Sequence, residues 1–146
     1  MAEERVSVLS ALGVAGDRDI LSQVMEFALS PEVHAQEALA ILATSATSRT
    51  GHRFTWNFFV ANFDKILDRY LGGLFLFARL VRCATENFSD EDSLREVADF
   101  FAANRAKLAG SESVVEQAEE HVRLNVAWRR HDMGNVQAFL DKYFNS

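Results

Sequence analysis

Apolar residues recur along this chain at the three- and four-residue spacing that is typical of amphipathic helices. The densest stretch covers residues 51–101 and begins with one long expected helix. The apolar residues on one face of that helix are Trp56, Phe59, Val60, Phe63, Ile66, Leu67, Tyr70 and Leu71. Gly72 and Gly73 interrupt the pattern, and a nearly all-apolar helix follows over residues 74–84. Two helices joined by a short loop form an αα-hairpin, whose large faces require further partners.

Capping signals locate the helices that precede this hairpin. A short first helix is expected to end near Gly13, and Asp17 is the expected N-cap of the second. Ser30 and Pro31 suit the N-cap and first position of a third helix, which would run to about Ala43. The inward apolar residues of the first two helices are Val6, Leu9, Leu12, Ile20, Leu21, Val24, Phe27 and Ala28.

Three more helices are expected after the hairpin. Ser89 is the expected cap of the first, because the acidic Glu91 and Asp92 that follow favour the positive end of a helix dipole. The second helix opens at Ser111 and Glu112. The inward residues of these two helices are Leu94, Val97, Ala98, Phe101, Leu108, Val115, Ala118, Val122, Asn125 and Val126. A separate final helix would present Val136, Phe139, Leu140, Tyr143 and Phe144.

The pattern as a whole predicts one all-α domain over residues 1–146. No segment alternates with period two, so no sheet is expected. The helices fall into hairpins over 17–46, 51–88 and 89–128, a spacing in the range of helical repeats. We therefore expect an α-α superhelix of antiparallel helix pairs, HEAT- or armadillo-like, with about seven or eight helices. An up-and-down bundle is the alternative architecture.

Composition narrows the class of protein. Hydrophobic residues make up 49% of the chain and charged residues 25%, which is typical of a globular protein rather than a disordered one. The net charge of −6 disfavours a nucleic-acid partner, because phosphate contacts need a basic surface. The apolar run 74–78 is far shorter than the ~20 residues of a membrane span, and no other run approaches that length, so no membrane partner is expected. The lone Cys83 and an acidic start without a signal peptide predict a cytoplasmic protein.

The residues that usually carry chemistry form no catalytic or metal-binding motif. None of the four histidines lies in an HExxH pattern, and His121 and His131 are ten residues apart, so no metal site is expected. Cys83 sits within an apolar helix, where a buried structural thiol is expected rather than a nucleophile. Gly72 and Gly73 are interpreted as a helix end that uses positive φ.

Two basic clusters stand out in this acidic chain. One contains Arg49, His52 and Arg53 at the start of an expected helix, and the other contains Arg129, Arg130 and His131 at the end of one. The second cluster suits the negative end of a helix dipole. Alternatively, these residues bind an anionic group such as a peptide carboxylate. Arg53, Arg129 and Arg130 are therefore the candidates for peptide contact.

The order of motifs resembles the C-terminal part of M1-family zinc aminopeptidases, most closely the puromycin-sensitive branch. The resemblance covers about residues 5–141 and is most specific where the family's spacing is kept: Gly51-His52-Arg53, Trp56, Asn62, Arg69-Tyr70 and Gly72-Gly73. Two positions depart from the family. Val33-His34-Ala35-Gln36-Glu37 stands where the family usually has Arg-x-Gln-Asp, and Phe63 replaces a tryptophan.

The resemblance implies a helical domain that closes the substrate chamber of a peptide-cleaving enzyme and steers peptide access. Its partners would be the catalytic domain of the same polypeptide and peptide substrates. The zinc-binding HExxH and the substrate-binding GxMEN motifs belong to earlier domains of such enzymes, and neither occurs here. No catalytic residue carries over, so this chain alone is expected to be inactive and to hold no cofactor, zinc belonging to the parent enzyme.

Two other functions suit the same residues. The chain could be a free-standing helical interaction module without enzymatic activity, or a bundle that binds a small ligand in an apolar cavity. Self-association through residues 1–29 is also expected, because the first helix of a helical stack exposes an apolar face unless a neighbour covers it.

Overall fold

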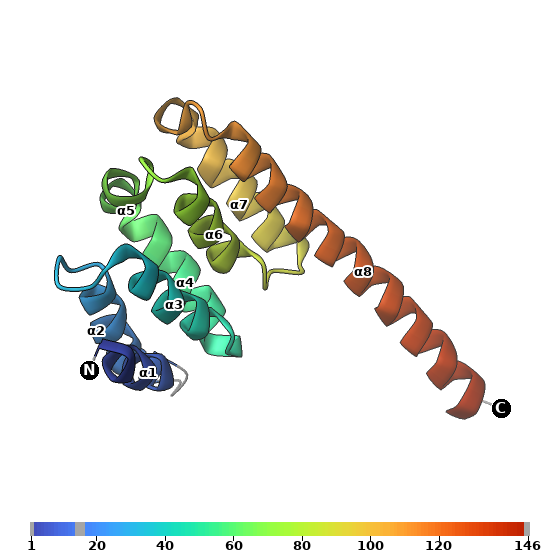
Figure 1. Cartoon of the computed structure of the whole chain (residues 1–146). Helices are drawn as coiled ribbons and strands as arrows, with labels where there is room; N and C mark the ends of the chain where they lie inside the picture. Colours follow the sequence, from blue (N-terminus) through green and yellow to red (C-terminus); the bar gives the residue numbers. More distant parts are fainter. Residues whose placement is uncertain (1, 14–16, 145–146) are drawn as a thin grey trace. The chain divides into compact units, whose positions relative to one another are not determined.

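The computed structural model describes residues 2–13 and 17–144, and the regular elements of those residues are all helical (Figure 1). This confirms the predicted all-α class. The chain divides into two compact units, the first ending at Asn87 and the second beginning at Phe88.

The first unit is built around one central helix. Its six helices are α1 (Ala2–Gly13), α2 (Arg18–Ala28), α3 (Ala35–Ala46), α4 (Arg49–Ala61), α5 (Phe63–Tyr70) and α6 (Leu74–Thr85). Helix α3 packs against α1, α2, α4 and α6, as Figure 1 shows. Its side chains Ala38, Leu39, Ile41 and Leu42 are nearly inaccessible to solvent, and they form the middle of the core.

The second unit is a helical hairpin with one long arm. It contains α7 (Glu91–Ala103), the short 3₁₀ helix η1 (Arg105–Leu108) and α8 (Glu112–Phe144). Helix α7 packs against α8, and its Val97 and Phe101 are buried. Gly110 adopts a φ of 87° between η1 and α8, and it is the one glycine with positive φ among the described residues. The predicted opening of this helix at Ser111 and Glu112 is confirmed.

Hydrogen bonds at the N-caps decide two of the predicted helix starts. Asp17 is confirmed as the cap of α2, since its carboxylate accepts from the N–H groups of Asp19 (2.9 Å) and Ile20 (3.3 Å). The predicted cap Ser89 is wrong by one residue. Asp90 caps α7 instead, because its two carboxylate oxygens accept from the N–H (2.8 Å) and the hydroxyl (2.7 Å) of Ser93.

The predicted start of α3 at Ser30 and Pro31 is wrong. Residues 30–33 form a turn in which the Val33 N–H donates to the Ser30 carbonyl (3.3 Å), and this turn carries Val33 into the core. Helix α3 begins later, with His34 as its N-cap. The Glu37 carboxylate reaches back to accept from the His34 N–H (3.3 Å), which is half of a capping box.

The long helix expected over residues 51–71 is broken at Asn62, between α4 and α5. The Asn62 side chain donates to the Phe58 carbonyl (3.0 Å), which also accepts from the Asn62 backbone N–H (3.0 Å), so the side chain competes with the backbone for this acceptor. The inward face predicted near this break is confirmed for Phe63, which is buried, and is wrong for Val60, which is 37% exposed.

The break predicted at the two glycines after α5 is confirmed, but its conformation is not the predicted one. Gly73 has a φ of −125° and serves as the N-cap of α6. Neither glycine uses the positive φ expected of a helix end.

The final helix predicted as a separate element does not exist as such. Helix α8 continues without a break from Glu112 to Phe144, because the lone Gly134 in its interior weakens a helix without ending it. The interpretation of Arg129 and Arg130 as residues at a helix end is therefore also wrong. Both lie in the interior of α8, well away from the negative end of its dipole. None of the helices among the described residues has an apolar stretch long enough to cross a membrane.

Candidate anion-binding hollow

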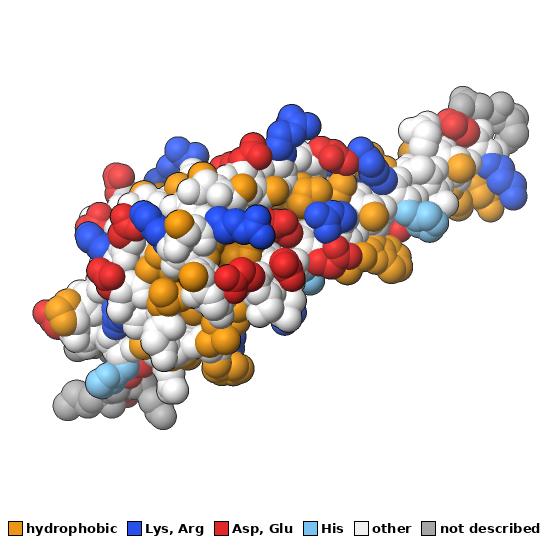
Figure 2. All heavy atoms as spheres, turned by 90° about the horizontal axis from the view of Figure 1, so that it is seen from above, with side chains coloured by type: hydrophobic (Ala, Val, Ile, Leu, Met, Phe, Trp, Pro, Cys, Tyr) orange, Lys and Arg blue, Asp and Glu red, His pale blue; other side chains and the backbone are white. Residues whose placement is uncertain are grey.

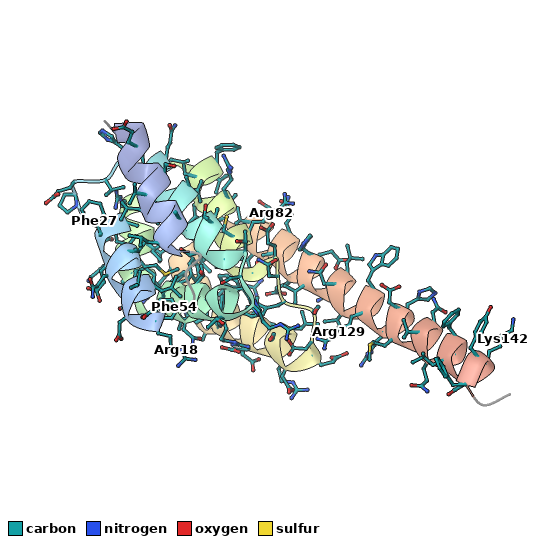
Figure 3. All side chains as sticks on the ribbon, turned by 90° about the horizontal axis from the view of Figure 1, so that it is seen from below. Arg18, Phe27, Phe54, Arg82, Arg129 and Lys142 are labelled. Atoms are coloured by element: carbon teal, nitrogen blue, oxygen red, sulfur yellow. The ribbon has the colours of Figure 1, made fainter. Side chains whose placement is uncertain are left out.

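Three arginines line one hollow on the surface of the first unit. Arg18 comes from α2, and Arg49 and Arg53 come from α4. The other lining residues are Thr50, Phe54, Asn57 and Phe58. Figure 3 shows the labelled Arg18 and Phe54 on the same side of this unit. The predicted candidate Arg53 thus lies in a basic hollow with an aromatic wall.

The turn between α3 and α4 positions two of these arginines. Ser48 caps α4, its hydroxyl accepting from the Gly51 N–H at 2.9 Å. A Cβ atom on Gly51 would lie 1.9 Å from the Ser45 carbonyl oxygen, so only glycine permits this approach of α4 to the end of α3. Arg49 and Arg53 are four residues apart on the helix that starts here, and they therefore share a face.

The electrostatics of the hollow favour an anion. Arg18 and Arg49 are the first residues of their helices, where the dipoles place partial positive charge. Both side chains are exposed, and no carboxylate among the described residues forms an ion pair with either. The nearby Asp17 carboxylate is occupied by the N–H groups that it caps. Guanidinium groups bind carboxylate and phosphate in a bidentate geometry, which suits this arrangement.

Arg129 and Arg130 belong to the second unit, whereas Arg53 belongs to the first. Arg129 Nη1 donates to Ser89 Oγ at 3.4 Å, and Arg130 Nη2 lies 2.5 Å from Glu91 Oε1. Both contacts join α8 to the beginning of α7. The sequence grouped these two arginines as one basic cluster, whereas the structure gives each a partner within its own hairpin.

Arg18, Phe54 and Phe58 were not predicted from the sequence as residues of this site. Arg18 directly follows a helix cap, and Phe54 and Phe58 are spaced as ordinary apolar residues of a helix. The placement of α2 beside α4 brings them together, and periodicity within one helix carries no information about that placement.

The Arg69-Tyr70 pair of the family resemblance has a structural role. Arg69 Nη1 donates to the carbonyls of Ala28 (3.1 Å) and Ser30 (3.3 Å), and Nη2 donates to that of Val33. One guanidinium therefore satisfies carbonyl groups at the end of α2 and in the turn after it. The buried Tyr70 hydroxyl donates to the Ala35 carbonyl at 3.3 Å, and burial raises the pKa of Tyr70 against a smaller lowering by Arg69.

The described residues offer no place for a metal ion. They contain no cluster of three or more His, Cys, Asp or Glu side chains in a geometry that could hold one, so a zinc ion does not fit the part of the chain that the structure describes. Cys83 is half-buried, and burial, with a smaller effect of Glu86, raises the pKa of its thiol. The predicted burial of Cys83 is therefore only partial, and a thiol with a raised pKa is a poorer nucleophile.

The family of the chain is shown by comparison with known proteins. The model of the ERAP1-like C-terminal domain matches residues 1–124. The chain belongs to the ERAP1-like C-terminal domain family. It is 32% identical to mouse aminopeptidase N over 93% of this chain and 14% of that protein. Rabbit aminopeptidase N is 29% identical over 96% of this chain and 15% of that protein.

These relatives confirm the coarser part of the predicted identity. This ERAP1-like domain is homologous to the C-terminal region of aminopeptidase N, in the M1 family. The chain spans about a seventh of the length of the relatives that it matches. The activity of those longer proteins is therefore not shown for this domain.

The predicted cytoplasmic location is wrong. This domain is 29% identical, over 95% of its length, to the mouse thyrotropin-releasing hormone-degrading ectoenzyme, and an ectoenzyme acts outside the cell. The prediction failed because a lone cysteine can form no intramolecular disulfide in any compartment. The count of cysteines therefore carried no information about redox environment in this domain.

Proposed function

We propose that this chain is the non-catalytic C-terminal domain of an M1 zinc aminopeptidase that removes N-terminal residues from peptides. The domain closes the substrate chamber and steers peptide access, and its partner is the catalytic domain of the same polypeptide. Its membership of the ERAP1-like C-terminal domain family and its homology to aminopeptidase N support the proposal. The absence of a metal-binding cluster among the described residues is compatible with a non-catalytic role.

The hollow of Arg18, Arg49 and Arg53 is the observation that best supports a role in steering peptide access. Three guanidinium groups and two helix N-termini concentrate positive potential in a chain of net charge −6. Phe54 and Phe58 add apolar surface beside these charges. A peptide offers both complements, a carboxylate for the arginines and an apolar side chain for the aromatic wall. We assign the hollow to the free carboxylate or an acidic side chain of a peptide substrate.

Titration of the chain with a short peptide tests this assignment. A peptide that ends in a free carboxylate should bind more tightly than the same peptide with an amidated end. The double variant Arg18→Gln, Arg49→Gln should weaken binding of the carboxylate form by about tenfold or more, because a charge-assisted pair is lost. The amidated form should be little affected.

The matched control is Arg130→Gln, which removes an arginine of the second unit. It should leave the affinity unchanged. Equal binding of both peptides, or an equal loss in the control, would contradict the assignment. Loss of affinity in the control alone would instead favour Arg129 and Arg130, the other predicted peptide contacts.

Several finer predictions extend the same proposal. We propose that the helix pairs curve as a HEAT-like superhelix, that residues 1–146 form one domain, and that the parent belongs to the puromycin-sensitive branch. Self-association through residues 1–29 is proposed as well, supported by the exposure of Val8 (59%) and Leu12 (39%) on α1. The side chain of Val6, part of the same predicted face, lies outside the described residues.

A further inference from the structure

The C-terminal half of α8 presents a row of large apolar side chains to solvent. We name this the exposed apolar face, and its residues are Met133, Val136, Phe139, Leu140, Tyr143 and Phe144. Their exposed fractions range from 40% for Leu140 to 78% for Phe144. Figure 2 shows apolar side chains at the surface of this part of the chain. The rings of Phe139 and Tyr143 lie 4.5 Å apart, so part of the face is an aromatic platform.

This face continues the side of α8 that α7 already covers. The buried residues of the first half, Val114, Ala118, Val122 and Val126, follow helical spacing along one side. With 3.6 residues per turn, Met133, Val136, Leu140 and Tyr143 fall on that same side. Their spacing of three, four and three residues is that of a helix–helix seam.

Helix α7 begins beside the middle of α8 and leaves the rest uncovered. Asn125 Nδ2 donates to the Phe88 carbonyl at 3.0 Å, and Arg130 pairs with Glu91 in the first turn of α7. Residues after Arg130 therefore extend beyond the start of α7, as Figure 1 shows for this hairpin. The seam continues for about 20 Å past its cover, at 1.5 Å per residue.

The apolar area has the size of an interaction patch. An aromatic side chain offers roughly 150–250 Å², so the three partly exposed rings of this face present on the order of 400 Å². The three aliphatic side chains add to this. Contiguous exposed patches of this size mark interaction sites, and a stable interface buries about 800 Å² on each partner.

We propose that the exposed apolar face binds the same face of a second copy of this chain, with the two α8 helices antiparallel. A parallel copy would bring its α7 to the same end of the pair as the first α7. Since α7 occupies the seam side of α8 there, the two α7 helices would collide. An antiparallel copy places the two α7 helices at opposite ends, and each bare half of α8 then covers the other.

Charge supports the same arrangement. The segment 128–144 carries Arg129, Arg130 and Lys142 against Asp132 and Asp141, so it is nearly neutral within a chain of net charge −6. Two copies that meet through this segment keep their acidic portions apart. An antiparallel pair also separates the two clusters of Arg129, Arg130 and His131, which a parallel pair in register would place side by side.

Sedimentation velocity of the chain over a range of concentrations tests the dimer. We expect a monomer–dimer equilibrium with a dissociation constant on the order of micromolar. Val136→Glu places a charge within the face and should raise that constant by at least about tenfold. The matched control is Ala138→Glu, two residues away on the opposite side of the helix, which should leave it unchanged.

A third variant separates this surface from the one predicted at residues 1–29. Leu12→Glu should leave the dimer intact if α8 forms the interface. A monomer at every concentration, or a dimer abolished by Leu12→Glu and kept by Val136→Glu, would overturn the proposal. Far-UV circular dichroism of each variant should match the parent chain, which shows that the helices persist. If Val136→Glu loses helical signal, Phe139→Ser takes its place in the same comparison.

Chemical cross-linking tests the antiparallel direction. Two variants are made in a Cys83→Ser background, one with Met133→Cys and one with Leu140→Cys, and a short bis-maleimide links them. In an antiparallel pair, residue 133 of one copy lies near residue 140 of the other, so a mixture of the variants should give the highest yield. In a parallel pair these positions are about 10 Å apart along the axis. Higher yields from each variant alone than from the mixture would overturn the antiparallel arrangement.

Discussion

Two aromatic-rich regions of this chain share the same helical spacing and end in opposite environments. In α4 and α5, Trp56, Phe59 and Phe63 are at most 4% exposed, and neighbouring rings lie 5.8 and 5.5 Å apart. In the second half of α8, Trp128 and Phe139 are 66% and 56% exposed. Helical spacing thus places apolar side chains on one face in both regions. Whether that face becomes core depends on the elements that pack against it.

Each region also contains a tryptophan, an arginine and a glycine, so the comparison can be tested with matched substitutions. The residues are Trp56, Arg69 and Gly51 in the first region, and Trp128, Arg130 and Gly134 in the second. The free energy of unfolding of each variant, measured by urea denaturation at low protein concentration, reports the difference. Low concentration removes any contribution from self-association.

The tryptophan pair should give the largest difference. Trp56→Ala removes a fully buried side chain and leaves a cavity, so it should lower the free energy of unfolding by about 3–5 kcal/mol. Trp128→Ala should change it by less than about 0.5 kcal/mol, because a surface side chain leaves no cavity. Similar losses from both would mean that Trp128 is covered within one copy of the chain.

The arginine pair should differ by less. Arg69→Met removes the donor for three backbone carbonyls around the α2–α3 turn and should lower the free energy of unfolding by about 1.5–3 kcal/mol. Arg130→Met breaks an ion pair whose side chains are 70% and 49% exposed, and such pairs contribute at most about 1 kcal/mol. A neutral Arg69→Met would contradict the capping role of that guanidinium.

The glycine pair should differ in sign. Gly51→Ala forces a Cβ atom against the Ser45 carbonyl and should lower the free energy of unfolding by about 1–3 kcal/mol. Gly134→Ala meets no atom within 4 Å and should raise it by about 0.5–1 kcal/mol, because alanine favours an exposed helix interior. A stabilising Gly51→Ala would show that α3 and α4 can separate at this turn without cost.

The fold class could be predicted because helical spacing is strong and strand spacing is absent. Buried Leu21, Val24, Val97 and Phe101 all lie at positions that the spacing selected. Helix starts were less predictable, because several capping residues compete within a few positions. Asp90, and not Ser89, is the N-cap of α7, because its carboxylate accepts two hydrogen bonds from Ser93. Both residue types are good N-caps, so local geometry determines which of them caps the helix.

The candidate site was predictable only in part. Arg53 was selected from the sequence as one member of a basic cluster, but its companion Arg18 belongs to another helix. Arg129 and Arg130 were predicted at a helix end, and the structure instead places them in the interior of α8. Local sequence reports the charge of a segment, whereas the approach of two helices decides which charges share a hollow.

The sequence by itself determined that this chain is helical, where most of its apolar faces lie, and which motif residues carry its family resemblance. Only the tertiary structure showed that Gly51 allows α4 to approach the end of α3 and that Arg69 binds carbonyl groups after α2. It also showed that α4 and α5 are separate helices at Asn62 and that the apolar side chains at the end of α8 are exposed. The physical reason is the range of the interactions. Hydrogen bonds and spacing within a helix involve residues a few positions apart, whereas burial depends on segments that are distant in the chain.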